Sequence, residues 1–83
     1  MKEFSTIIEL SKDVKNKINA YNESEPAQKP IFYNELLDYV KEIMSNPRHR
    51  AMIYRGNGIA TVFEKTLGRW RMKIWKELID KLK

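Results

Sequence analysis

The strongest helical pattern of the chain lies in residues 59–82, IATVFEKTLGRWRMKIWKELIDKL. With side chains spaced at about 100° around a helix axis, the apolar residues of this stretch share one side: Ile59, Phe63, Leu67, Trp70, Ile74 and Leu78. Four cations fall on roughly the opposite side: Lys65, Arg69, Lys73 and Lys76. The pattern therefore predicts one helix over about 60–82, with a core face and a basic face.

Two features within this stretch bear on its bounds. Thr61 followed by Glu64 fits a capping box, in which the two side chains satisfy free amides at a helix start. Gly68 lies in the middle of the predicted helix, where glycine costs about 1 kcal/mol relative to alanine. We therefore expect Gly68 to have a packing reason or to mark a break.

Two other helices are expected before this one. The first covers about 3–21 because apolar residues recur at three- and four-residue steps. Thr6 with Glu9 fits a capping box at its start, and Ser5 or a start near Lys2 is equally allowed. A polar linker with two prolines follows at 22–30, NESEPAQKP. The second helix covers about 31–45, where two adjacent apolar rows make a wide face. Asn46 and Pro47 end it and suit the cap and first residue of another helix.

Residues 47–58 allow two interpretations. As a helix, the segment begins at Pro47 and ends before Gly56, which suits the left-handed position after a helix. As a hairpin, Asn57-Gly58 is a strong two-residue turn signal between β-prone flanks. The periodicity through Ile59 and Phe63 favours the helix.

A chain of 83 residues is expected to form one domain with a modest core. We expect an all-α fold, a small four-helix bundle over residues 1–83. The alternative is an α+β fold with a β-hairpin near 51–63. The predicted core contains Ile7, Val14, Ile18, Leu36, Leu37, Val40, Phe63, Leu67, Trp70, Ile74 and Leu78.

Charge is distributed unevenly along the chain. Residues 1–47 hold six lysines, no arginine and eight carboxylates, a net charge of −2, whereas residues 48–83 hold ten cations and three carboxylates, a net charge of +7. Such asymmetry favours an anionic partner, because the summed field attracts polyanions before any contact forms.

The basic half predicts a small regulatory or accessory protein that binds nucleic acid, with DNA favoured over RNA. Arginine binds two phosphate oxygens at once and lysine acts as a point charge, so both suit a phosphate-binding surface. If the segments on either side of residue 58 are adjacent, seven cations share one surface: Arg48, Arg50, Arg55, Lys65, Arg69, Lys73 and Lys76. An acidic protein surface is the other partner of fitting charge.

The alternative function is a protein-binding regulator or inhibitor. Met72, Trp75 and Ile79 lie on the flank of the 60–82 helix and extend its apolar arc. We expect at least two of them to stay partly exposed and to meet a protein partner or a second copy in a homodimer. Membrane contact is not favoured, because the basic helix would have to leave the bundle.

Nothing in the sequence favours catalysis. Cysteine is absent, and the one histidine, His49, stands between Arg48 and Arg50, where we expect it in an exposed basic turn. Glu35, Asp38 and Glu42 share one helical face that we interpret as solvated. We therefore expect no enzyme, no catalytic residue, no cofactor and no metal site. Without a long apolar run or signal segment, a cytoplasmic protein is expected.

Overall fold

Thr6 begins the first helix, as the capping-box pattern predicts. The computed structural model describes residues 3–83, and α1 covers Ile7–Glu23. The Thr6 hydroxyl accepts a hydrogen bond from the Glu9 amide at 3.2 Å and donates one to the Glu9 carboxylate at 3.3 Å. Because this cap fixes the start, α1 begins four residues later than the expected start near residue 3. Phe4 lies outside the helix with its side chain in the core.

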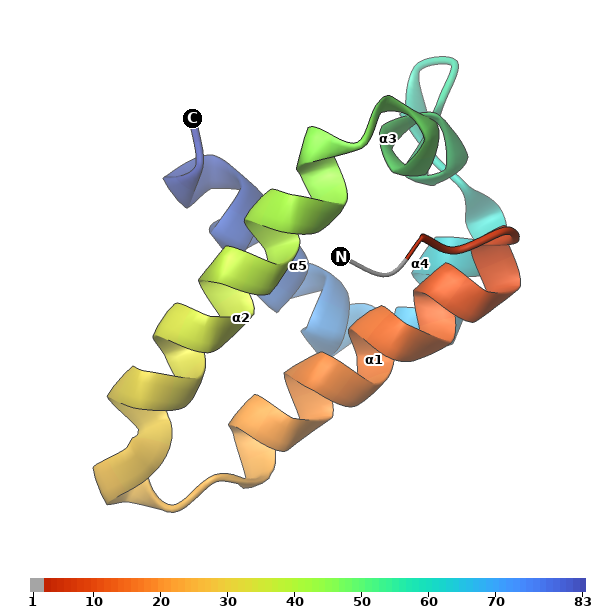
Figure 1. Ribbon diagram of the computed structural model, residues 1–83. Helices are drawn as coiled ribbons and strands as arrows, with labels where there is room; N and C mark the ends of the chain where they lie inside the picture. Colours follow the sequence, from red (N-terminus) through yellow and green to blue (C-terminus); the bar gives the residue numbers. More distant parts are fainter. Residues whose placement is uncertain (1–2) are drawn as a thin grey trace.

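The polar linker turns the chain back toward α1. It contains a short 3₁₀ helix, η1 (Pro26–Gln28), which leads into α2 (Lys29–Ser45). The Lys29 ammonium donates to the carbonyls of Tyr21 and Asn22, each at 3.0 Å, and so caps the free end of α1. In Figure 1 α1 and α2 form two arms of a V that meet at η1.

Residues 47–59 contain both of the structures that the sequence left open. α3 covers Pro47–Ile53, and the Asn46 side chain caps it by accepting from the Arg48 amide at 2.9 Å, as predicted. A short hairpin follows, with β1 (Tyr54–Arg55) antiparallel to β2 (Gly58–Ile59). Its turn residues are Gly56 and Asn57, one position earlier than expected, because Arg55 pairs with Gly58. Gly56 has a φ of 57°, which suits this turn.

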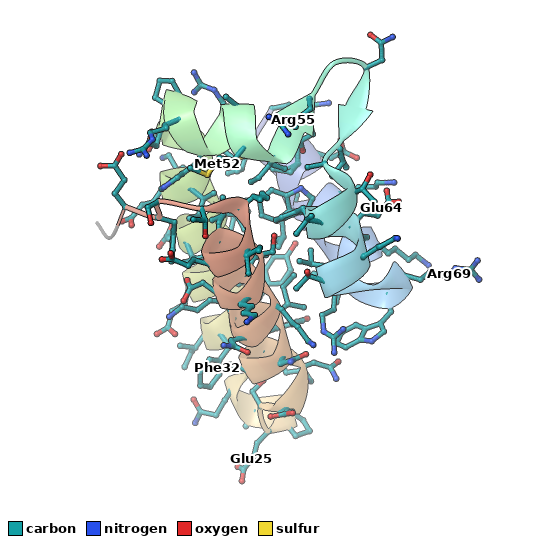
Figure 2. All side chains as sticks on the ribbon, turned by 90° about the vertical axis from the view of Figure 1, so that its right-hand side faces the viewer. Glu25, Phe32, Met52, Arg55, Glu64 and Arg69 are labelled. Carbon is teal, nitrogen blue, oxygen red and sulfur yellow. The ribbon has the colours of Figure 1, made fainter. Side chains whose placement is uncertain are left out.

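The single helix expected over 60–82 is two helices, α4 (Thr61–Leu67) and α5 (Arg69–Lys81). The helix is interrupted at Gly68, which has φ 80° and ψ 172°. Residues with a Cβ rarely adopt this backbone conformation. The proposed capping box is also wrong, because α4 is preceded by Ala60 and has no side-chain cap. Figure 2 shows α4, marked by Glu64, beside α1.

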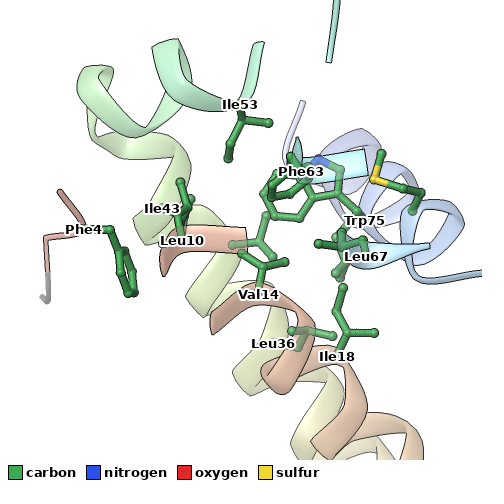
Figure 3. Packing of buried hydrophobic residues seen from close by; sticks show 13 residues of the cluster. Phe4, Leu10, Val14, Ile18, Leu36, Ile43, Ile53, Phe63, Leu67 and Trp75 are labelled. Atoms are coloured by element: carbon green, nitrogen blue, oxygen red, sulfur yellow. The ribbon is translucent and has the colours of Figure 1, made fainter. Parts of the chain in front are cut away.

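The break changes which residues of α5 face the core. Trp70, expected to be buried, is 42% exposed, whereas Met72 and Trp75, expected on the flank, are buried. In an uninterrupted helix, the side of the axis on which each residue lies would follow from its spacing to Phe63. Because the chain changes direction at Gly68, the side chains of α5 face other directions than this spacing predicts. The Trp75 ring then packs edge-on against Phe63, with centroids 5.0 Å apart (Figure 3). Its indole N–H donates to the Tyr54 hydroxyl at 3.3 Å.

Most of the other core predictions are confirmed. The core cluster joins α1, α2, α3, α4 and α5 (Figure 3). The expected core residues that are buried in it are Val14, Ile18, Leu36, Val40, Phe63, Leu67 and Leu78. Ile7, Leu37 and Ile74 are half-buried and pack against the cluster. The fold is thus a small helical bundle with one short hairpin.

None of the helices described in residues 3–83 is both long enough and apolar enough to cross a membrane.

We predict that Gly68→Ala lowers the free energy of unfolding by about 1–3 kcal/mol, because alanine is strained at this positive φ. Space is not the cause, since a Cβ there would meet only the Arg71 guanidinium at 3.6 Å. Urea denaturation measures the loss. Gly58→Ala is the matched control, because a Cβ at Gly58 meets nothing within 4 Å. Equal stability of the two variants would contradict the prediction.

Candidate functional site

The junction of α4 and α5 forms a basic surface groove. Its volume is about 460 Å³, and we call it the elbow groove; it is lined by Glu64, Lys65, Gly68, Arg69, Met72, Lys73 and Lys76. Lys65 reaches it from α4 and the other three cations from α5. These four are the residues that the sequence placed on one basic face, and the structure brings them together.

The four cations of the elbow groove have no ion-pair partner within residues 3–83. The two ion pairs of this part of the chain join Arg48 to Glu3 at 2.8 Å and Lys83 to Asp80 at 3.6 Å. Glu64 is the one carboxylate that lines the groove. Four cations and one carboxylate leave the groove with a net positive charge, so the local field is positive.

Arg48 and Arg50, two of the seven expected cations, do not line the elbow groove and contact protein oxygens elsewhere. Arg48 donates to the Glu3 carboxylate at 2.8 Å and so ties the N-terminal segment to α3. Arg50 donates to the Met44 carbonyl at 2.8 Å, near the end of α2. The expectation that all seven cations share one surface is therefore wrong, because α3 packs against the ends of α1 and α2.

Arg55 does not line the elbow groove either. Tyr54 directs its hydroxyl to Trp75 of α5. Successive side chains of a strand point to opposite faces, so Arg55 points away from α5. It remains exposed on the hairpin.

Arg71 is a structural residue that the sequence analysis did not select. Its guanidinium donates to the Asn19 side chain at 2.7 Å and to the Leu67 carbonyl at 2.5 Å. These bonds tie α5 to α1 and satisfy a carbonyl at the end of α4. No periodicity signals this role, because it depends on the break at Gly68.

Trp70 lies in the first turn of α5, beside the elbow groove. Its indole is 42% exposed, and the Arg71 guanidinium lies 4.5 Å from its ring centroid. The ring thus packs on a cation that is itself held by two hydrogen bonds. Trp70 is three residues before Lys73, a spacing that makes them neighbours on a helix.

The expected protein interface is not on the surface. Met72 is 5% exposed and Trp75 is fully buried, while Ile79 is half-buried against the core. The expectation that at least two of these residues stay exposed enough to meet a partner is wrong, because the new phase of α5 turns them inward.

His49 is fully buried, not exposed in a basic turn as expected. Its Nε2 accepts a hydrogen bond from the Phe4 amide at 3.0 Å, and its ring packs at 5.6 Å from that of Phe4. The Nδ1 atom is buried without a hydrogen-bond partner in residues 3–83. His49 therefore anchors the N-terminal segment on α3.

The acidic row of α2 is exposed, as expected: Glu35, Asp38 and Glu42. On the inner side of α2, the Tyr39 hydroxyl donates to the Asp13 carboxylate at 2.5 Å. Burial, together with this hydrogen bond and the charge of Asp13, raises the pKa of Tyr39 well above its usual value. Within residues 3–83 no cluster of His, Asp and Glu side chains is arranged to hold a metal ion.

Comparisons of the chain with protein-family models, with curated proteins and with solved structures return no match.

We predict that Arg71→Ala lowers the free energy of unfolding by about 1–3 kcal/mol, because two charge-assisted hydrogen bonds are lost. Thermal or urea unfolding followed by circular dichroism measures the change. Lys73→Ala is the control, since Lys73 is exposed and its ammonium makes no ion pair within residues 3–83; the substitution should change stability by less than about 0.5 kcal/mol. A loss in the control as large as in Arg71→Ala would refute the division between structural and unpaired cations.

Proposed function

We propose that this chain binds nucleic acid through its phosphates, at the elbow groove. The observation that carries the proposal is the convergence of Lys65, Arg69 and Lys73 with Lys76 around one hollow. Phosphate contacts of this kind supply affinity without reading bases. A small accessory protein that coats or tethers nucleic acid needs no more than such a surface.

The contrast with the other arginines supports this proposal. Arg48, Arg50 and Arg71 each donate to an oxygen of the protein, so binding a phosphate would compete with an existing contact. Among residues 3–83, no protein oxygen accepts a hydrogen bond from a cation of the elbow groove, so a phosphate would displace no such contact. Their charges repel one another in the free protein, and a bound polyanion would relieve that repulsion.

The charge distribution of the whole fold also orients the protein. In Figure 2, Glu64 and Arg69 lie on one side of the molecule and α2 lies on the other. Phosphates would repel the exposed carboxylates of α2, so the elbow groove would face the nucleic acid as the two molecules meet.

The alternative function, a protein-binding regulator or inhibitor, was inferred from an exposed patch of Met72, Trp75 and Ile79, and this patch is not exposed. With Met72 and Trp75 in the core, homodimerisation through that patch would require α5 to leave the bundle. An acidic protein surface remains a partner of fitting charge for the elbow groove, and the experiment below separates it from nucleic acid.

We expect binding to weaken steeply with salt. Four phosphate contacts predict a slope of log K against log salt of about −3.6 for duplex DNA and about −2.8 for a single strand. Raising salt from about 50 to 200 mM would then weaken duplex binding by about 150-fold. Fluorescence anisotropy with labelled duplex DNA, single-stranded DNA and RNA measures the slopes. Absence of binding to all three at low salt would discard the proposal and favour an acidic protein partner.

Charge reversal in the groove tests the location of binding. Lys73→Glu should weaken binding to every probe, by about tenfold or more at about 100 mM salt, because one counterion-releasing contact is lost and a repulsion is added. The matched control is Lys41→Glu, which makes the same change of charge on the exposed surface of α2. If both variants lose affinity equally, binding follows net charge and not this groove.

A further inference from the structure

An exposed tryptophan is held in a fixed position beside the elbow groove. Trp70 packs against Arg71 at 4.5 Å from its ring centroid, and Arg71 is itself bonded to Asn19 and Leu67. The indole still leaves 42% of the residue's surface accessible. The indole presents a large, flat aromatic face, so this side chain is a candidate contact for a planar, apolar group.

The position of Trp70 relative to the cations suits the binding of single-stranded nucleic acid. Around α5, Trp70 lies about 60° from Lys73 and about 100° from Arg69. Proteins that bind single strands combine a basic groove, which follows the backbone, with aromatic side chains on which bases stack. Here the elbow groove is the basic groove, and Trp70 is the aromatic side chain on which a base would stack.

The length of the basic surface does not suit a helix lying in a duplex groove. Along α5, the cations from Arg69 to Lys76 span about 10 Å, a footprint of a few nucleotides. Beyond them the exposed side of α5 carries Glu77 and Asp80. If α5 lay in the major groove of a duplex, these carboxylates would approach the phosphates and be repelled.

We propose that the elbow groove selects single-stranded nucleic acid, with Trp70 stacking on a base while the cations of the groove contact the flanking phosphates. This inference rests on the proposed function, since it specifies which nucleic acid the same site takes. The stacked base would lie on the accessible side of the indole, and Arg71 would support the opposite side.

The test compares a labelled single strand of about 12 nucleotides with a hairpin duplex of the same sequence, at one salt concentration. We expect the single strand to bind at least about tenfold more tightly. Trp70→Ala should weaken single-strand binding by about 5- to 100-fold and change duplex binding less than about twofold. Trp70→Phe, which keeps an aromatic ring, should retain most of the affinity.

Two controls separate stacking from loss of structure. Val62→Ala removes another exposed apolar side chain, from α4, and should leave both affinities unchanged. An abasic strand with the same phosphates should bind the native protein about as weakly as the normal strand binds Trp70→Ala, and should not respond to that substitution. Circular dichroism shows whether each variant is folded.

The outcomes distinguish this inference from the function on which it rests. If duplex and single strand bind equally, or if Trp70→Ala leaves single-strand affinity unchanged while Lys73→Glu lowers it, single-strand selection is wrong and phosphate binding stands. If neither probe binds the native protein at low salt, both the proposed function and this inference are wrong.

Discussion

The positive φ of Gly68 is the constraint on which the C-terminal half of the structure depends. It ends α4, redirects the chain, and lets α5 turn Trp75 onto Phe63. The same turn places the Arg71 guanidinium within hydrogen-bonding distance of Leu67 and Asn19, so the packing and the polar contacts stabilise one geometry. A residue with a Cβ would oppose this turn through backbone strain, even though the space beside Gly68 is open enough for a methyl group.

The elbow groove is a consequence of that turn. Lys65 approaches from the end of one helix, and Arg69 and Lys73 approach from the start of the next, so their charges border a hollow instead of lying along a rod. The protein uses its other arginines differently. Arg48, Arg50 and Arg71 already donate hydrogen bonds to protein oxygens before any ligand arrives. The number of positive charges does not distinguish cations that bond to the protein from cations that are free to bind a ligand, whereas the hydrogen-bond partners do.

Local rules predicted the parts of the fold that depend on local contacts. α1 and α2 follow from helical periodicity, and the caps at Thr6 and Asn46 follow from side chains that bond amides two or three residues away. The grouping of Arg69 and Lys73 with Lys76 was also predictable, because residues within α5 keep their spacing wherever the helix begins. The positions of Trp70 and Trp75 were not predictable, since a helical wheel that continues through Gly68 places Trp70 in the core and Trp75 on the flank, the reverse of what is observed. The burial of His49 depends on Phe4, which is 45 positions away, and no local pattern reports such a contact.

Binding at the elbow groove can be located by an NMR titration of the ¹⁵N-labelled protein with a short single-stranded oligonucleotide at low salt. If the elbow groove binds phosphates, the amides of residues 64–76 and the indole N–H of Trp70 should shift first and saturate together. The indole N–H of Trp75, a fully buried residue whose N–H donates to the Tyr54 hydroxyl, should shift little. Shifts concentrated on α2 or on the hairpin, or no shifts at millimolar oligonucleotide, would contradict the account.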